Sequence, residues 1–237
     1  MREVSSAIIQ KTLKHLEERK KIIDFDTLGR TLAYSPFVPR VDRDFFVRET
    51  QKESQPKLAY QWIISPYEFC QAPENYLYQG YQNEQDYRFD AYWLDLWSAF
   101  LDTDFDDRLM GFNLLESISL LRRHSTLPII HCNVFLQPYQ ILESALFGAD
   151  ALMMPASIVS AKELQSLLDF AYRLGFVVFV GVENQNDLKK AIFSGANTLF
   201  VGREHIEEIL TLIPQSCVIA SDSDNQYGVD LCIKNFN

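Results

Sequence analysis

The chain has 237 residues and a formal net charge of -10, from 22 Lys and Arg against 32 Asp and Glu. A chain this acidic repels phosphate backbones and anionic membrane surfaces, so neither a nucleic acid nor a membrane is an expected partner. With 47% hydrophobic residues and only 9 Gly and 9 Pro, the composition excludes disordered and collagen-like proteins. The length suits one α/β-barrel domain.

The cysteines are scattered, with no CxxC pair and no Cys/His cluster, at Cys70, Cys132, Cys217 and Cys232. This spacing favours neither a zinc site nor a disulfide framework and is typical of a reducing compartment. The first thirty residues resemble neither a signal peptide nor a membrane span. We therefore expect a cytoplasmic protein without a metal or a cofactor.

The first third of the chain predicts few regular elements. Apolar residues at helical spacing predict an amphipathic helix over Ser5–Ile23, and a shorter helix is expected over Asp42–Glu53. The first strand is expected over Lys57–Ile64, where Ser65-Pro66 stops it. The aromatic and polar stretch Tyr67–Tyr87 has no clear periodicity.

From Phe89 onward, apolar runs alternate with amphipathic stretches. Strands are expected over Phe89–Trp97, Leu127–Phe135, Ala151–Met154, Phe176–Val182, Thr198–Val201 and Cys217–Ala220. Helices are expected over Met110–Arg123, Pro138–Phe147, Ala161–Leu174, Asn186–Ser194 and Glu204–Leu212. Successive βα units predict a (β/α)8 TIM barrel. The sequence has no Gly-rich phosphate-binding loop before any of these helices, which argues against a nucleotide-binding doubly wound sheet. We expect a single domain, with residues 1–55 as an N-terminal helical extension and 56–237 as the barrel.

The final unit is abnormally short. The last expected strand, Gly228–Ile233, follows a link, Ser221–Tyr227, that is too short for a crossover helix. The sequence therefore leaves open whether the eighth strand closes the barrel. An open edge invites pairing with a second copy, so a homo-oligomer through this C-terminal edge is one expectation.

Aromatic residues are dense in the first half, at Tyr76, Tyr78, Tyr81, Tyr87, Tyr92, Trp93, Trp97 and Phe100. Core packing is the favoured explanation. The alternative is an exposed aromatic surface for association.

Several phrases of the sequence match one family. They are Pro138-Tyr139-Gln140-Ile141, Gly148-Ala149-Asp150, Arg43-Asp44-Phe45, Pro56-Lys57 and Ser65-Pro66. Between Arg40 and Ile233 the chain resembles the indole-3-glycerol phosphate synthase family. The resemblance implies a TIM barrel preceded by an extra helical segment. It also implies a lyase of tryptophan biosynthesis, which decarboxylates a phosphorylated carboxyphenylamino-deoxyribulose and closes its ring with a lysine general acid and carboxylates.

The catalytic positions of that family can be followed residue by residue. The glutamate and lysine of the first strand fall on Gln61 and Ile63, or in the other register on Tyr60 and Trp62. The general-acid lysine falls on Cys132. The glutamate of the fifth strand falls on Gly181, and the asparagine after the sixth strand falls on Gly202. The turns after the seventh and eighth strands fall on Ser221-Asp222-Ser223 and Lys234-Asn235-Phe236.

Acid–base catalysis needs protonatable groups within reach of the reacting atoms. The matched positions therefore predict a catalytically inactive relative that acts as a small-molecule-binding or interaction protein and holds phosphate esters weakly. Two alternatives remain: a divergent enzyme on the same barrel, and residual synthase activity.

The strand end His131-Cys132-Asn133 could supply a nucleophile and a base. However, neighbouring side chains on a strand point to opposite faces, so a buried structural cysteine is favoured. Asp95, a carboxylate in an apolar strand, is either paired or a candidate acid at the barrel mouth.

Residues after the later strands could also contact a ligand, because barrel sites are built from βα loops. Arg203, Glu204 and His205 follow the sixth strand, although Glu204 could simply begin the next helix. The ligand-binding candidates at the barrel mouth are Asp95, Cys132, Asn133, Arg203, Asp222 and Lys234. The acidic run Asp102–Asp107 is better explained as a solvated loop than as a cation site.

Overall fold

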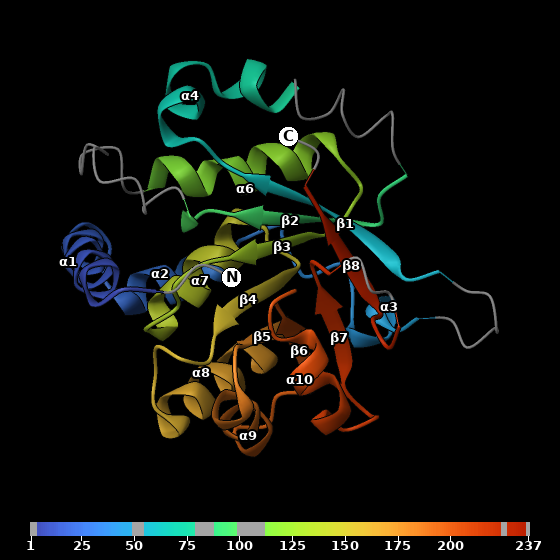
Figure 1. Ribbon diagram of the computed structural model, residues 1–237. Coiled ribbons are helices and arrows are strands. Elements are labelled where there is room, and N and C mark those ends of the chain that lie inside the picture. Colours follow the sequence, from blue (N-terminus) through green and yellow to red (C-terminus); the bar gives the residue numbers. More distant parts are fainter. Residues whose placement is uncertain (1–3, 49–54, 79–87, 99–111, 224–226, 236–237) are drawn as a thin grey trace.

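A computed structural model describes residues 4–48, 55–78, 88–98, 112–223 and 227–235. Eight parallel strands form a closed barrel in sequential order (Figure 1). They are β1 (Lys57–Ile63), β2 (Ala91–Asp95), β3 (Ile129–Cys132), β4 (Ala151–Pro155), β5 (Val177–Val182), β6 (Thr198–Val201), β7 (Val218–Ser221) and β8 (Leu231–Lys234). The expected (β/α)8 TIM barrel is confirmed.

The helices lie outside the ring of strands (Figure 1). Before the barrel come α1 (Ser6–Ile22), α2 (Phe25–Leu32) and α3 (Arg43–Phe46). Around it lie α4 (Pro66–Gln71), α6 (Phe112–His124), α7 (Pro138–Phe147), α8 (Ala161–Arg173), α9 (Gln185–Phe193), α10 (Ile206–Ile209) and the short 3-10 helix η3 (Leu210–Leu212). In the described part of the chain, no helix is both long enough and apolar enough to cross a membrane.

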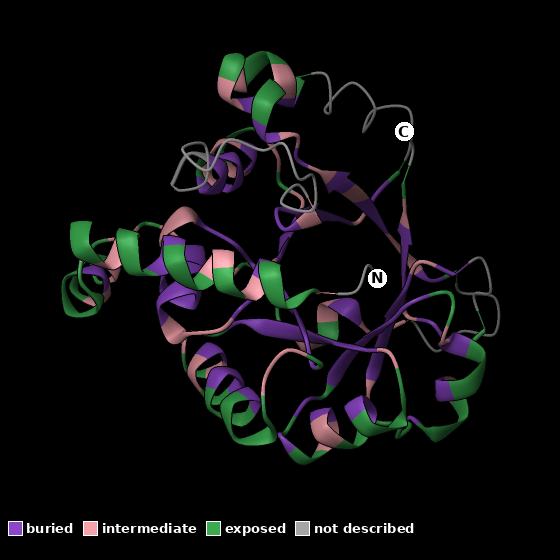
Figure 2. Cartoon of the chain, turned by 60° about the vertical axis from the view of Figure 1, so that its left-hand side comes forward, coloured by how far each residue is buried: buried purple, intermediate pink, exposed green. Residues whose placement is uncertain are grey.

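Strand alternation divides the core into two layers. Residues such as Ala91, Trp93, Phe179 and Phe200 point inward and form a core inside the barrel. Their neighbours point outward and pack against the helices, whose far faces consist of exposed residues, drawn green in Figure 2. This is the arrangement that the period of two predicts for strands buried on both faces.

Different N-terminal segments occupy the two ends of the barrel. We call the end where the strands begin the lower end and the end where they finish the upper end. Phe46 of α3 is buried in the core inside the barrel, which we call the inner core, and its ring centroid lies 5.1 Å from that of Phe179. Helix α1 contributes Ile8 to the same core, and in Figure 2 it runs in front of the barrel.

Several expected boundaries hold because local signals set them. Ser5 caps α1 by accepting a hydrogen bond from the amide of Ile8, and α7 ends at Gly148, which adopts the left-handed conformation. Ser160 and Glu163 form a reciprocal capping box at the start of α8.

Three expectations about the first third need correction. The helix expected over Asp42–Glu53 ends at Phe46 within the described residues. Helix α2 was not expected; Asp24 caps it, and its contact with α7 stabilises it. Helix α4 lies in the stretch thought to lack periodicity, because Ser65-Pro66 begins a helix there as well as ending β1.

The structure answers the question that the sequence left open, because the barrel is closed. Strand β8 pairs with both β7 and β1, so the described strands leave no open edge. The final unit is short, as expected, because the nine residues between Ser221 and Leu231 return without the usual crossover helix in their described part. Extended chain of that length spans up to about 30 Å, which exceeds what a four-residue strand requires. Association through an open C-terminal edge therefore loses its structural basis.

Candidate functional site

The upper end of the barrel contains a cavity of about 250 Å³. Its described lining residues come from five strands and from the loops after β2, β6 and β7. They are Gln61, Ile63, Trp93, Asp95, Trp97, Ser98, Met153, Phe200, Glu204, Asp222 and Ile233. Active and binding sites of TIM barrels lie at this end, so the cavity is the candidate site.

Strand β1 settles which of its residues face this cavity. Gln61 lies beside Trp93 in the sheet, Ile63 lies beside Asp95, and both line the cavity. Tyr60 and Trp62 point outward and pack in the outer core. Of the two registers that the sequence left open, the one that matches the family's glutamate and lysine to Gln61 and Ile63 places both residues in the site. The site therefore has an amide and an aliphatic side chain at these two positions.

Asp95 ends β2 and is almost fully buried. Its Oδ1 accepts hydrogen bonds from the amides of Trp97 and Ser98, and its Oδ2 accepts one from the Ser98 hydroxyl at 2.6 Å. The carboxylate therefore holds the loop after β2 while it also borders the cavity. Asp95 is thus both hydrogen-bonded and located at the barrel mouth, and its role as an acid or a ligand-binding group stays a prediction.

Cys132 lies in the inner core at 1% exposure, and it is not among the residues that line the cavity. Burial, followed by the charge of Asp95, raises the pKa of the Cys132 thiol well above its usual value. A protonated thiol is a weak nucleophile, so this environment does not activate Cys132.

His131 points away from Cys132 toward α7, as strand alternation predicts. The Ser144 hydroxyl donates to the carbonyl of Gln140, so it must accept from Nδ1–H of His131. Nε2 of His131 then accepts from the Asn133 amide. Burial lowers the pKa of His131 to about 3, so the ring is neutral and its hydrogen bonds hold the end of β3 in place.

Asn133 belongs to a different cavity from the one at the barrel mouth. It lines a space of about 40 Å³ between the end of β3 and helix α1, together with His131, Gln140 and the Arg19–Glu143 ion pair. This volume suits a water molecule more than a substrate. The structure therefore separates Asn133 from the other candidates.

The remaining matched positions offer little chemistry. Gly181 lies on β5 between Pro155 and Phe200, and Gly202 follows β6. Ser221 is fully buried, and its hydroxyl accepts a hydrogen bond from the amide of Ser223. None of these three is among the residues that line the cavity.

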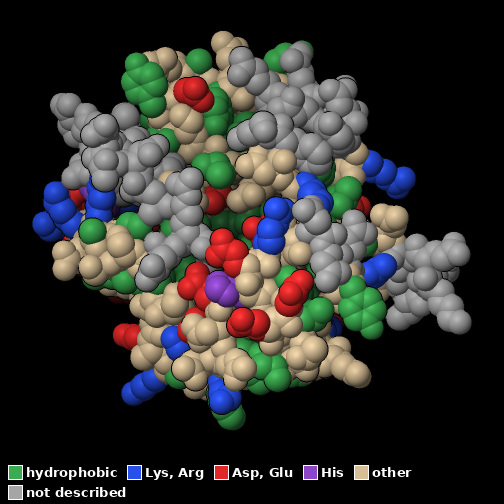
Figure 3. Space-filling model, in the orientation of Figure 1, with side chains coloured by type: hydrophobic (Ala, Val, Ile, Leu, Met, Phe, Trp, Pro, Cys, Tyr) green, Lys and Arg blue, Asp and Glu red, His purple; other side chains and the backbone are tan. Residues whose placement is uncertain are grey.

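Asp222 and Glu204 line the cavity, whereas Arg203 and Lys234 do not. The guanidinium of Arg203 donates to the carbonyl of Asp222, and the Arg203 amide donates to Asp222 Oδ1. Asp and Glu side chains gather around a hollow near the middle of the face in Figure 3, with hydrophobic side chains inside it. Lys and Arg side chains stand beside this hollow.

Sequence reasoning missed the aromatic wall. Trp93, Trp97 and Phe200 were taken as packing or not singled out, yet they line the cavity beside Asp95. The available signal was alternation, because Trp93 shares an inward face with Asp95. Of the aromatic set, Tyr92, Trp93 and Trp97 are buried and Tyr78 is exposed, while Tyr81, Tyr87 and Phe100 lie outside the described residues.

The acidic run Asp102–Asp107 also lies outside the described residues. Within the described ranges, no group of three His, Cys, Asp or Glu side chains is arranged to hold a metal ion.

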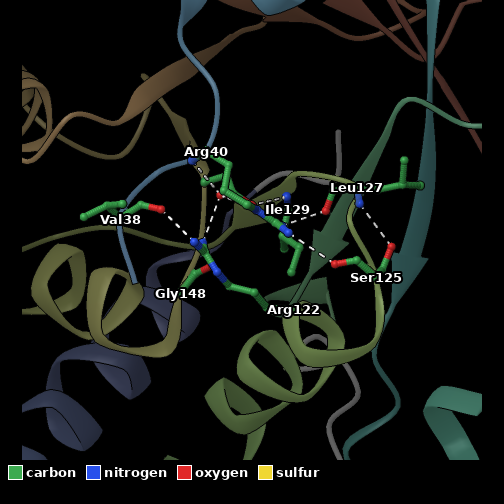
Figure 4. Close-up of polar contacts among 8 residues, drawn as sticks. Val38, Arg40, Arg122, Ser125, Leu127, Ile129 and Gly148 are labelled. Carbon is green, nitrogen blue, oxygen red and sulfur yellow. Dashed lines mark hydrogen bonds and ion pairs between the residues drawn. The ribbon is translucent and has the colours of Figure 1, made fainter. Parts of the chain in front are cut away.

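One phrase shared with the family builds the lower end of the barrel (Figure 4). Asp150 is fully buried before β4 and accepts hydrogen bonds from Arg40, Arg122 and the amide of Ile129. Arg122 also donates to the carbonyls of Gly148 and Val38. This phrase therefore ties the N-terminal extension to the barrel, away from the cavity.

Comparison with known proteins gives a consistent family. The family model described as indole-3-glycerol phosphate synthase matches residues 113–214. A protein of that name from Campylobacter jejuni subsp. doylei is 28% identical, over 91% of this chain and 83% of its own length. Another from Campylobacter hominis is 28% identical, over 94% of this chain and 89% of its own length.

Solved structures with the same fold are more distant in sequence. KGPDC from Streptococcus mutans aligns with a TM-score of 0.55 at 11% identity, over 76% of this chain and 88% of that one. A chain of the tryptophan synthase α2β2 complex from Pyrococcus furiosus aligns with a TM-score of 0.54 at 12% identity, over 76% and 87%. These likenesses support the barrel fold alone, whereas the sequence matches show that the chain is similar to the indole-3-glycerol phosphate synthase family and support its membership of that family.

Proposed function

We propose that this family member does not catalyse the synthase reaction and instead binds a small molecule in the cavity at the upper end of its barrel. One observation carries the proposal. Among the described residues that line the cavity there is no lysine, and the three ionisable side chains are the carboxylates of Asp95, Glu204 and Asp222. A carboxylate is ionised at neutral pH and cannot replace a lysine as a proton donor unless its pKa is strongly raised.

Charge supports the same conclusion. The substrate implied by the family carries a carboxylate and a phosphate, and three carboxylates around a small cavity repel such an anion. No arginine is among the described lining residues, so the usual attraction of phosphate to guanidinium groups is missing from that lining.

Residual synthase activity is the second candidate. It is favoured by the relatives named as synthases, which match 91% or more of this chain. A divergent reaction is the third candidate, and it would have to use Asp95, Glu204 or Asp222 as its base or nucleophile, because Cys132 does not line the cavity.

A turnover assay separates the two candidates. We expect purified protein to form no indoleglycerol phosphate from carboxyphenylamino-deoxyribulose phosphate above a protein-free blank. The Campylobacter jejuni relative, assayed at the same concentration, should convert the substrate. Turnover by this chain that survives repeated purification would show that the catalytic groups lie at residues other than those matched above.

The thiols provide an independent test of the divergent-enzyme alternative. We expect an alkylating reagent to label the half-buried Cys70 and Cys217 of the native protein well before Cys132, because thiol reactivity follows exposure and thiolate content. Peptide mass spectrometry at successive times measures the order, and buried Cys232 serves as an internal control. Labelling of Cys132 first would point to an activated nucleophile.

A further inference from the structure

We infer that the cavity at the upper end of the barrel selects an organic cation with an aromatic or otherwise apolar body. The inference rests on the proposed binding function and names the class of ligand. It implies that the charge preference of the site is opposite to the one expected for a phosphorylated substrate.

The first argument is the charge of the lining. Asp95, Glu204 and Asp222 reach the cavity from the ends of β2, β6 and β7, so three carboxylates surround one small space. No Lys, Arg or His is among the lining residues that the structure describes. Fixed carboxylates in a partly enclosed site attract cations and repel anions.

The second argument is the aromatic wall, which is independent of the charge. Trp93 and Trp97 are each 3% exposed and line the cavity, and the ring of Phe200 lies 5.2 Å from that of Trp93. The face of a tryptophan ring attracts an ammonium or a quaternary nitrogen more strongly than other aromatic faces do. Carboxylates combined with tryptophan are therefore suited to a cationic group that carries apolar surface.

Polar groups of the lining add a third argument. The side chain of Gln61, a half-buried residue of β1, borders the cavity and forms no hydrogen bond with the described residues. Its amide oxygen can accept a hydrogen bond from an ammonium N–H, and its NH2 group can donate one to a ligand oxygen.

The size of the cavity limits the ligand. Its volume of about 250 Å³ lies below the range of roughly 300–1,000 Å³ that is usual for drug-sized ligands. Met153 and Ile233 add apolar surface to its lining. A compact amine with a single ring fits this description better than an extended sugar phosphate.

The test compares three probes of similar shape and different charge. Phenethylamine is the cation, 3-phenylpropanoate is the anion and 2-phenylethanol is the neutral control, and calorimetry at neutral pH measures binding of each to the full chain. We expect phenethylamine to bind most tightly, 2-phenylethanol more weakly and 3-phenylpropanoate not at all. Higher salt should weaken the binding of the cation and leave that of the alcohol unchanged.

Two variants assign the preference to the cavity. Glu204→Gln and Asp222→Asn should each weaken phenethylamine binding about threefold, as expected for partly exposed charge pairs. The matched control is Glu207→Gln, an exposed residue of α10 that does not line the cavity and should leave binding unchanged. Circular dichroism of each variant checks that the fold is intact.

The outcomes separate the inference from the proposed function. Tighter binding of 3-phenylpropanoate than of phenethylamine would overturn the charge preference and leave a small-molecule binder. No binding of phenethylamine at millimolar concentration, or equal losses in the control variant, would also overturn the inference. Turnover of the synthase substrate would overturn the proposed function whichever probe binds.

Discussion

The two ends of the barrel use ionisable residues in opposite ways. At the lower end, the buried carboxylate of Asp150 is surrounded by two arginines and a backbone amide. At the upper end, three carboxylates border a cavity with no described cation in its lining. The lower end pairs its buried carboxylate with arginines, whereas the upper end gathers three carboxylates around the space where a ligand could bind.

At the lower end, the same type of hydrogen bond between an aspartate and a backbone amide occurs at three strands. Asp90, Asp150 and Asp230 each stand directly before a strand and accept a hydrogen bond from a backbone amide at the start of the preceding strand in the barrel. The partners are Leu58, Ile129 and Ile219. These carboxylates fix where neighbouring strands begin, and such a role depends on the fold alone.

This difference explains why a family resemblance does not settle the activity. The shared Gly148-Ala149-Asp150 phrase belongs to the lower-end network. Gln140 of the shared Pro138–Ile141 phrase accepts from two amides and donates to the carbonyl of Val134, which holds the loop after β3. The residues that make the family recognisable therefore build the scaffold, while the chemistry of a barrel lies in the loops at its upper end.

The largest effect is expected at Asp150. Asp150→Asn leaves two arginines beside a neutral group in a buried position, which should lower the free energy of unfolding by about 3–5 kcal/mol. Denaturant titration measures the loss. The matched change at the upper end, Asp222→Asn, should cost less than about 1 kcal/mol because Asp222 is only partly buried. Equal losses would remove the contrast between the ends.

The next effect compares two glycines with the same backbone conformation. Gly148 and Gly195 both have φ of 91°. A Cβ at Gly148 would lie 2.7 Å from Arg122 Cδ and 3.0 Å from the Phe37 ring, whereas at Gly195 it would meet nothing within 4 Å. Gly195→Ala should therefore cost about 1 kcal/mol for its backbone alone. Gly148→Ala should cost about 2–3 kcal/mol, because the network beside it must also move.

Thermal or chemical unfolding of the two glycine variants gives the comparison. Similar losses at both positions would mean that the packing around Gly148 relaxes freely. In that case the lower end would be less rigid than its hydrogen bonds indicate.

A smaller change in the free energy of unfolding, expressed per pH unit, is expected from the titration of His131. Its pKa is about 3 in the folded protein, against about 6.5 in an unfolded chain. Between these values the unfolded state binds more protons, so stability is lost as the pH falls from 6 toward 4. One group contributes about 1.4 kcal/mol per pH unit in this window.

Denaturant titrations at several pH values test this sign. His131→Gln should reduce the pH slope by about one proton compared with the parent chain, since the other titrating groups are common to both. An unchanged slope would mean that His131 is accessible to solvent, and the end of β3 would then be more open than the structure indicates.

Local patterns predicted most of the βα units. The helix over Pro138–Phe147 and the strand over Thr198–Val201 were predicted with the bounds observed, because a proline start, a glycine stop and a continuous apolar run are encoded within a few residues. Alternation also predicted that Cys132 and His131 face opposite sides. Helices α2 and α4 were missed, because short helices depend on the surfaces against which they pack.

The sequence by itself determined the parallel βα architecture, because that architecture follows from apolar periods of 2 and 3.6 residues. It also predicted that the positions matched to the family's lysines hold other residues. Only the tertiary structure decided that β8 closes the barrel against β1, that Gln61 and Ile63 face the cavity, and that Asn133 does not. The physical reason is distance along the chain. Closure pairs Lys57 with Leu231, and the cavity gathers side chains from five strands and from the loops after β2, β6 and β7, so no local pattern could specify either.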